Sequence, residues 1–227
     1  MRIDILTIFP NMFAAVLNES IIKRAQKKER VNINVYNLRD YSPDKHRKVD
    51  DKPFGGGAGM IMRPEPIFNA VKDIRSKAKS KKPKIILLSP QGEKLSHIVA
   101  KRLLKYKHLI LICGHYEGID ERIRKFLVDE EISIGDYILT GGELPAMVFI
   151  DCIIRLIPGV LGEKKSLHLE SFEGNLLEYP QYTRPANYQS MKVPSILLSG
   201  DHKKIEQWRK RQAIKITKQK RPDLLSV

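Results

Sequence analysis

The sequence predicts an α/β protein in which a parallel sheet, covered by helices on both faces, precedes a smaller basic helical domain. Short β-branched runs alternate with helix-like segments along the first part of the chain, as expected of strands joined by helical crossovers. The runs IILL and LILI are apolar throughout, as are strands that are buried on both faces. After about residue 162 this alternation stops, which indicates a domain boundary.

The larger domain is expected to contain four strands and four helices. The strands are the runs IDILTI, VNINVY, KIILLS and HLILIC, at residues 3–8, 31–36, 84–89 and 108–113. Segments with helical character lie between and after these strands, at residues 11–28, 64–79, 94–105 and 118–128.

The smaller domain is expected to be irregular at first and then helical. Residues 163–195 contain Pro180, Pro185 and Pro194 and have no sustained period. A helical pattern resumes near residue 201, with Asp201 or Ser199 as its N-cap and one face made of Ile205, Trp208, Gln212 and Ile216. The predicted division is a domain at 1–162, a linker at 163–175 and a basic helical domain at 176–227.

The charge of the chain suggests a polyanionic partner. Its 41 Lys and Arg exceed its 26 Asp and Glu, which gives a net charge of +15 and a pI of about 9.7. Nucleic acid is the leading candidate, because each Lys or Arg that neutralises a phosphate releases condensed counterion. An anionic membrane surface is the second candidate, and a merely solubilising basic surface is the third.

The cysteines and the termini point to the cytoplasm. Cys113 and Cys152 lie far apart in apolar runs, which is typical of buried thiols in a reducing compartment. The N-terminus shows no signal-peptide pattern, and no apolar run is long enough to cross a membrane. We therefore expect a cytoplasmic protein without a membrane partner.

Three glycine-containing loops follow predicted strands or strand-like segments. They are SPQG at 89–92, GHYEG at 114–118 and SIGDYILTGGELPAM at 133–147. None has the spacing of a phosphate cradle or a dinucleotide turn. Ligands gather at the carboxyl ends of parallel strands, and these loops suit a positively charged adenosine better than a phosphorylated one. Each loop alone could equally be an ordinary tight turn.

Taken in order along the chain, these and other segments resemble the bacterial tRNA (guanine-37 N1)-methyltransferase family, the TrmD family of the SPOUT superfamily. The further matching segments are DKPFGGGAGMIM at 51–62, IPGVLG at 157–162, YTRP at 182–185 and KRPDLL at 220–225. Several of them are weak individually, but the ordered set is specific.

The resemblance implies a SPOUT-type parallel sheet with a deep trefoil knot, S-adenosyl-L-methionine as methyl donor, and a homodimer whose active sites are shared between subunits. Magnesium use by relatives leaves a Mg²⁺ requirement open, because no dedicated ligand cage is visible. The implied cofactor-binding residues are Leu88, Ser89, Pro90, Gly114, Tyr116, Glu117, Gly118, Ser133, Ile134, Gly135, Asp136, Tyr137, Ile138, Leu139, Gly141, Gly142 and Pro145. In this interpretation the Gly pair turns tightly around adenosine, while nearby acids tolerate a sulfonium.

The resemblance also implies the catalytic residues. Arg155 matches the family Arg before the I-P-G segment, and Glu170 stands where the family usually has an Asp that acts as base. Glu provides the same carboxylate on a longer side chain, so the role survives if the loop compensates. Glu173 and Glu178 are nearby alternatives that do not match the register.

For RNA, the resemblance implies contact with the anticodon arm of tRNA. The basic, Gly-rich loop at 41–60 and the C-terminal helix would hold the RNA, with Asp50, Gly55, Gly56, Gly57, Gly59 and Arg209 binding the substrate. Two departures accompany these matches: His115 stands where Arg is frequent, and the chain ends at Val227, before a further helical segment that many members carry.

The expected function is therefore methyl transfer to N1 of guanine 37 in tRNA, next to the anticodon, with a carboxylate as general base. Two alternatives stay open. One is a non-catalytic RNA-binding member of the same fold, which the Glu at position 170 makes conceivable. The other is a ribose 2′-O-methyltransferase.

Overall fold

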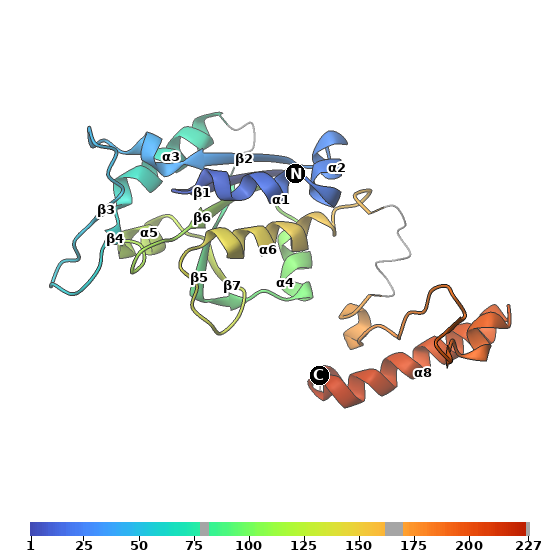
Figure 1. Ribbon diagram of the computed structural model, residues 1–227. Coiled ribbons are helices and arrows are strands. Elements are labelled where there is room, and N and C mark those ends of the chain that lie inside the picture. Colours follow the sequence, from blue (N-terminus) through green and yellow to red (C-terminus); the bar gives the residue numbers. More distant parts are fainter. Residues whose placement is uncertain (78–81, 162–169, 226–227) are drawn as a thin grey trace. The chain divides into compact units, whose positions relative to one another are not determined.

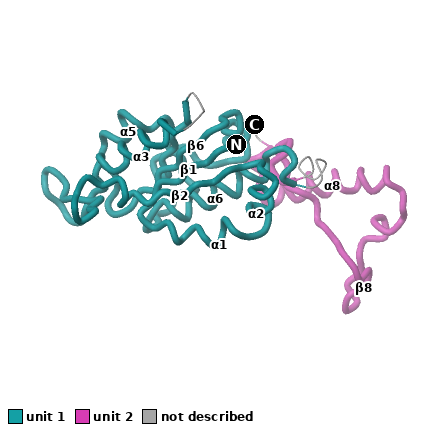
Figure 2. Tube along the Cα trace, turned by 90° about the horizontal axis from the view of Figure 1, so that it is seen from above, with its two compact units in different colours: residues 1–162 teal, residues 163–227 magenta. Residues whose placement is uncertain are grey.

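The computed structural model describes residues 1–77, 82–161 and 170–225. The chain forms two compact units, the first unit at residues 1–162 and the second unit at residues 163–227, which are coloured separately in Figure 2. Residues 78 and 79 of the helix expected at 64–79, Gly162 of the IPGVLG segment, and residues 163–169 of the expected linker lie outside the described residues.

A five-stranded parallel sheet forms the centre of the first unit (Figure 1). Its order is β2-β1-β6-β5-β7, from β1 (Arg2–Thr7), β2 (Asn32–Asn37), β5 (Lys84–Lys94), β6 (His108–Cys113) and β7 (Glu130–Ser133). Every residue of β6 is buried. The four expected strands are confirmed with small shifts at their ends, except that β5 continues to Lys94. Strand β7 was not predicted.

Helices cover both faces of the sheet (Figure 2). On one face, α3 (Pro64–Lys77) and α5 (Glu121–Phe126) contribute Ile67, Ile74 and Ile123 to a hydrophobic core shared with the strands. On the other face, α6 (Glu143–Ile154) packs on β6 and contacts α2 (Ser20–Lys27) and α4 (His97–Leu103). Helices α4 and α5 are shorter than the segments predicted for them.

The prediction of one continuous helical segment at 11–28 is wrong. This region consists of η1 (Pro10–Phe13), α1 (Ala14–Leu17) and α2. Glu19 is extended, with φ −128° and ψ 164°, and Ser20 has a φ of 49°. The Asn18 side chain donates a hydrogen bond to the Ala14 carbonyl (2.8 Å), which is a local bond that competes with continuation of the helix.

A long loop of the first unit connects η2 (Leu38–Tyr41) to α3. Its outer part, residues 50–62, is called the arm below. The arm begins with β3 (Asp50–Asp51) and ends with β4 (Ile61–Met62), which pair antiparallel with Asp50 opposite Met62. The glycine-rich turn lies between these two short strands.

Within its described residues, 170–225, the second unit is built on the helix α8 (His202–Lys220). Asp201 is its N-cap and accepts a hydrogen bond from the Lys204 amide (3.1 Å). Of the two N-cap residues predicted, Asp201 and Ser199, the first is therefore confirmed. The Thr217 hydroxyl donates to the Ala213 carbonyl (2.7 Å) and accepts from the Leu177 amide (2.9 Å), so it ties the preceding irregular segment to the helix.

The other elements in the described part of the second unit are short: η3 (Glu173–Asn175), β8 (Asn187–Tyr188), β9 (Met191–Lys192), η4 (Ser195–Leu198) and η5 (Pro222–Leu225). The irregular character expected of residues 163–195 is confirmed for the part that the structure describes, residues 170–195. Across the described parts of both units, no helix combines the length and apolarity that crossing a membrane requires.

Candidate functional site

A cavity of about 380 Å³ lies at the carboxyl ends of β5, β6 and β7. Its volume falls within the range of about 300–1,000 Å³ typical of small-molecule sites. The three glycine-containing loops converge on it, as parallel strands ending at one edge of a sheet require. Of the cofactor-binding residues predicted, all but Asp136 line the cavity: Leu88, Ser89, Pro90, Gly114, Tyr116, Glu117, Gly118, Ser133, Ile134, Gly135, Tyr137, Ile138, Leu139, Gly141, Gly142 and Pro145.

The cavity also has lining residues that sequence reasoning missed. Most lie next to predicted ones on the same strands or loops, and adjacency alone was the available signal. Arg124 comes from α5, and nothing in the sequence connected that helix to the site. These residues are Leu87, Gln91, His115, Ile119, Arg124, Ile132 and Thr140.

The first wall is an excursion of β5 away from its neighbour. Ile132 of β7 pairs with both Leu88 and Glu93, so the four residues between them leave the sheet and return. Gly92 permits the return, because a Cβ at this position would lie 2.3 Å from the Glu131 carbonyl carbon. Within the excursion, the buried Ser89 hydroxyl accepts a hydrogen bond from the Gln91 amide (3.2 Å).

The second wall follows β6 and turns sharply. Tyr116 has a φ of 59° and Gly118 a φ of 135°, and the Gly118 amide donates to the His115 carbonyl (3.2 Å). The His115 ring meets the rings of Phe9 and Tyr116 edge-on, at centroid distances of 5.0 and 5.1 Å. Its Nδ1 atom is buried and has no hydrogen-bond partner among the described residues. An unsatisfied buried atom beside a cavity is a candidate contact for a ligand.

The third wall contains the Gly141–Gly142 pair. The Gly142 amide donates to the Gly114 carbonyl (2.8 Å), and a Cβ on Gly142 would lie 2.7 Å from the Cys113 Cα. Gly142 has a φ of −81°, so it is not required by a left-handed turn. Glycine is needed here because this wall packs closely against the end of β6. We had expected a tight turn to be the reason for the Gly pair.

The acids around the third wall do not line the cavity. Glu143 is buried and accepts a hydrogen bond from the Thr7 hydroxyl (2.7 Å). The Asp136 carboxylate, with 76% of its side chain exposed, forms an ion pair with Lys94. Among the residues that the structure describes, Glu117 contributes the carboxylate of the cavity lining.

The arm carries the predicted substrate-binding residues of the first unit. Asp50 lies at its base in β3, while Gly55, Gly56, Gly57 and Gly59 all have positive φ values, between 80° and 122°. Such values favour glycine. Phe54, at the tip, is fully exposed. Lys45, Arg47 and Lys48 precede the arm, and Lys52 lies within it beside Asp50 and Asp51.

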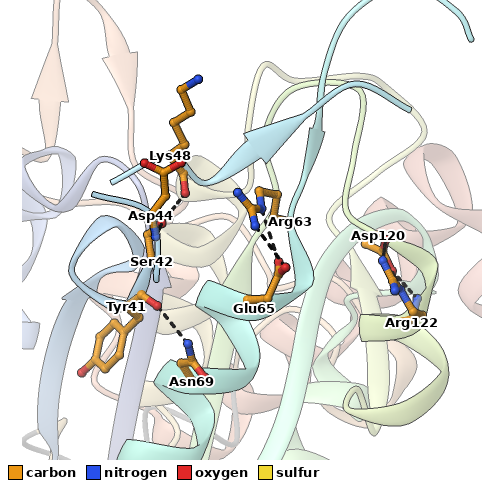
Figure 3. A network of polar contacts seen from close by, with 9 residues as sticks. All are labelled: Tyr41, Ser42, Asp44, Lys48, Arg63, Glu65, Asn69, Asp120 and Arg122. Carbon is orange, nitrogen blue, oxygen red and sulfur yellow. Dashed lines mark hydrogen bonds and ion pairs between the residues drawn. The ribbon is translucent and has the colours of Figure 1, made fainter. Parts of the chain in front are cut away.

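A polar network surrounds the base of the arm (Figure 3). Arg63 forms an ion pair with Glu65 (3.1 Å), and Arg122 forms one with Asp120 (2.7 Å). The hydrogen bond from Arg63 lowers the pKa of the Glu65 carboxyl below its usual value. The Ser42 hydroxyl donates to the Lys48 carbonyl (2.5 Å) and thus closes the loop that leads into the arm.

The remaining predicted site residues lie in separate units. Arg155 caps the C-terminus of α6 in the first unit. In the second unit, Glu170 and Arg209 line a cavity of about 450 Å³, and Arg209 also lines a second one of about 460 Å³. The Arg209 guanidinium lies 4.8 Å from the centre of the Tyr179 ring, a cation–π contact. Joint action of Arg155 and Glu170 stays a prediction.

Other chemistry finds less support in the described residues. No group of three or more His, Cys, Asp or Glu side chains in these ranges is arranged to hold a metal ion. The two cysteines are free thiols, Cys113 buried and Cys152 half-buried. Burial raises the pKa of Cys113, and the Glu143 charge adds to the shift. This thiol is therefore protonated and unreactive at neutral pH.

Comparison with known proteins covers the chain from end to end. The family model described as tRNA (Guanine-1)-methyltransferase TrmD matches residues 1–227. A tRNA (guanine-N(1)-)-methyltransferase of Ruminiclostridium cellulolyticum is 59% identical over 100% of this chain and 97% of its own length. Proteins of that name from Bacillus pumilus (57%; 99% of this chain, 92% of their own) and Moorella thermoacetica (56%; 100% and 90%) are similar as well.

Proposed function

The chain belongs to the tRNA (guanine-1)-methyltransferase family, and we propose that it transfers a methyl group from S-adenosylmethionine to N1 of guanine 37 in tRNA. The observation that carries this proposal is the match of the family model and of relatives above 55% identity along the whole chain. The convergence of three strand-end loops on one cavity supports it independently, because a transferase needs a site for its small donor.

The cavity has the features that the donor requires. S-adenosylmethionine, when bound, supplies a methyl group on a positively charged sulfur. Glu117 offers a carboxylate to that positive charge, and the buried Nδ1 of His115 offers a partner for a polar group. Gly118 has open space where a Cβ would lie, which allows the close backbone approach of a nucleoside. Cavity lining by these residues supports donor binding.

The chemistry requires a base and a stabilising cation. Guanine N1 carries a proton, and its lone pair is delocalised, so it attacks a methyl group poorly until that proton leaves. We assign removal of the N1 proton to the Glu170 carboxylate. We assign stabilisation of the negative charge that develops on O6 to the Arg155 guanidinium. Both assignments rest on matches to the family motif and on side-chain chemistry.

Glu170 differs from the Asp that is usual at this position in the family. Its carboxylate lies one methylene further from the backbone, and a misplacement near 1 Å can lower a rate by about two orders of magnitude. Glu170 therefore acts as base only if the backbone around it compensates. The hydrogen bond from the Glu173 amide to the Glu170 carbonyl (3.2 Å) begins a turn at this position.

We propose a homodimer whose subunits meet through α6 and the segment before it. Helix α6 is apolar on both sides: Phe149 and Ile153 are buried, whereas Leu144 and Val148 are each 50% exposed. A helix that is apolar all round is normally covered on every side. Met12, on the neighbouring η1, extends the exposed apolar surface. The shared active sites and the deep trefoil knot are proposed from family membership alone.

We propose that the anticodon arm of tRNA is held by the arm of the first unit and by the basic face of α8. A cytoplasmic location follows from the tRNA substrate and from the two free thiols.

Nucleoside analysis of product RNA tests the function directly. Unmodified tRNA with guanines at positions 36 and 37 is incubated with the protein and S-adenosylmethionine, digested, and measured by mass spectrometry. The expected product is 1-methylguanine at position 37, absent from tRNA with adenine there. Binding of tRNA without methylation would indicate a non-catalytic RNA-binding protein, and an alkali-stable dinucleotide would indicate a ribose 2′-O-methyltransferase.

A further inference from the structure

The arm is joined to the second wall of the cavity through the backbone. The Glu117 amide donates to the Met60 carbonyl (3.0 Å), and the Met62 amide donates to the Gly118 carbonyl (2.9 Å). A third bond runs from the Asp120 amide to the Met62 carbonyl (3.0 Å). Residues 60–62 thus lie along the loop that lines the cavity as a short parallel strand would.

At one point the arm also packs against a side chain of the cavity. A Cβ on Gly59 would lie 2.4 Å from Cγ of Glu117 and 2.6 Å from its Oε1. The Glu117 side chain therefore lies directly over the Gly59 backbone. The same residue lines the cavity. Glu117 thus contacts the arm through its side chain and also lines the candidate donor site.

Gly200, in the second unit, differs from Gly59 in this respect. Gly200 has a φ of 74° and Gly59 a φ of 81°, so the two share one backbone conformation. A Cβ on Gly200 would meet nothing within 4 Å. An alanine at either position costs similar backbone strain, but only an alanine at 59 moves Glu117. The chain therefore contains its own matched control.

The arm is anchored at its base as well. The Arg63 amide donates to the Val49 carbonyl (2.8 Å), and the Arg63–Glu65 ion pair lies immediately beyond it at the start of α3 (Figure 3). An arm held at its base and along 60–62 moves with the cavity wall, while its tip stays exposed for a partner.

We propose that the contact between Gly59 and Glu117 couples the arm to the cavity, so that RNA held by the arm and the methyl donor raise each other's affinity. A donor that fixes the Glu117 side chain fixes the surface on which Gly59 rests. By thermodynamic linkage, RNA that fixes the arm improves donor binding by the same factor. Gly59 is then a positioning residue for the transfer. The inference rests on the proposed function, because it needs a donor in the cavity and RNA on the arm.

Calorimetry on the full chain tests the coupling. The ligand is sinefungin, a donor analogue that cannot transfer a methyl group, with and without a saturating anticodon stem–loop of the substrate tRNA. For the unmodified chain we expect the stem–loop to raise sinefungin affinity by about fivefold or more. Gly59→Ala is expected to weaken sinefungin binding severalfold and to reduce the stem–loop effect to less than twofold. Gly200→Ala is expected to preserve both.

A double-mutant cycle identifies the route. Glu117→Ala removes the side chain that an alanine at 59 would displace. In that background, Gly59→Ala should have no further effect on sinefungin affinity. Additive effects of the two substitutions would show that Gly59 acts without Glu117 and would overturn the proposal, as would equal behaviour of Gly59→Ala and Gly200→Ala.

Two checks keep the result interpretable. Thermal unfolding of both glycine variants verifies that each folds, and if Gly59→Ala does not, loss of the stem–loop effect in Glu117→Ala decides in favour of coupling and its retention decides against. If the unmodified chain binds neither sinefungin nor S-adenosylmethionine, the proposed function itself fails. If it binds both ligands without coupling, only the present inference fails.

Discussion

The two units have different interiors. In the first unit, the central strands β1 and β6 bury nearly all of their side chains between two layers of helices. Even a carboxylate, that of Asp4, is fully buried there, with hydrogen bonds from His108 and Arg2. In the described part of the second unit, the buried residues are Ala213 and Thr217. A rigid sheet can hold three loops around a cavity, whereas a single helix with irregular flanks mainly presents its surface.

This difference suggests a division of labour between the units. The walls of the cavity are fixed by backbone contacts that tolerate no side chain, as at Gly92 and Gly142. The proposed base, Glu170, lies in the unit with the smaller interior, where its position depends on local turns. We therefore expect donor binding and proton removal to be separable by mutation.

The largest expected effect is a loss of methylation rate without a loss of donor binding. Glu170→Gln should lower the methylation rate by about 10²–10⁴-fold, because the amide cannot take the N1 proton. Sinefungin affinity should stay unchanged. The matched control is Glu173→Gln, which alters another acid lining the same cavity of the second unit. Single-turnover rates with labelled donor measure both, and full activity of Glu170→Gln would remove this residue from the mechanism.

A smaller effect is expected on stability, and it should differ between the two units. Asp4→Asn should lower the free energy of unfolding by about 2 kcal/mol, because it removes a charge that accepts hydrogen bonds in the core. The control is Asp201→Asn in the second unit, where Asn is as good an N-cap as Asp and little change is expected. Urea unfolding followed by circular dichroism measures both.

The Asp4 contribution also depends on pH. Burial alone would raise the pKa of this carboxyl, but the hydrogen bonds from His108, Arg2 and Asn34 bring it below its ordinary value. Because the folded-state pKa is lower than the unfolded one, the stabilisation is complete above about pH 4 and is lost as the pH falls through the folded value. The difference between Asp4→Asn and the unmodified chain should therefore shrink in acid. A difference that grew in acid would contradict this assignment.

The smallest expected effect concerns RNA affinity. Replacing the exposed Lys210 and Arg211 of α8 with Ala should weaken tRNA binding severalfold. It should also flatten the salt dependence, by about one in log–log slope for each phosphate that is no longer neutralised. Removing two charges from α2 and its C-terminal end, at Lys27 and Lys28, is the control. Equal weakening in both variants, measured by filter binding at several salt concentrations, would show that net charge and not the second unit holds the RNA.

Sequence reasoning predicted the strands that have a recognisable local pattern. It missed the elements whose residues fit only because of their partners in the folded chain. HLILIC is recognisable because it is buried on both faces. Strand β7 is only EEIS, and its two Glu residues are compatible with a strand because Glu130 pairs with Lys84 and Arg102 and Glu131 with Arg124. Helix α6 has no helical period to detect, because it is apolar on both faces.

The candidate site was predictable to a similar degree. Motif matches located the three walls, since their glycines and neighbours are contiguous in sequence. The identity of the cavity carboxylate was not readable among several nearby acids: Asp136 pairs with Lys94 at the surface and Glu143 bonds Thr7 in the interior, leaving Glu117 at the cavity. Choosing among acids requires knowing their partners, which only the folded chain provides.

The excursion of β5 has a consequence for altering the chain length. Ile132 pairs on both sides of it, and Lys94 then pairs with Ser133. One residue added or deleted between Leu88 and Glu93 would shift that register and send alternate side chains to the opposite face. An epitope tag or fluorophore loop would therefore unfold this edge, whereas the open space around Gly55 and Gly56 offers a position where such an insertion would be tolerated.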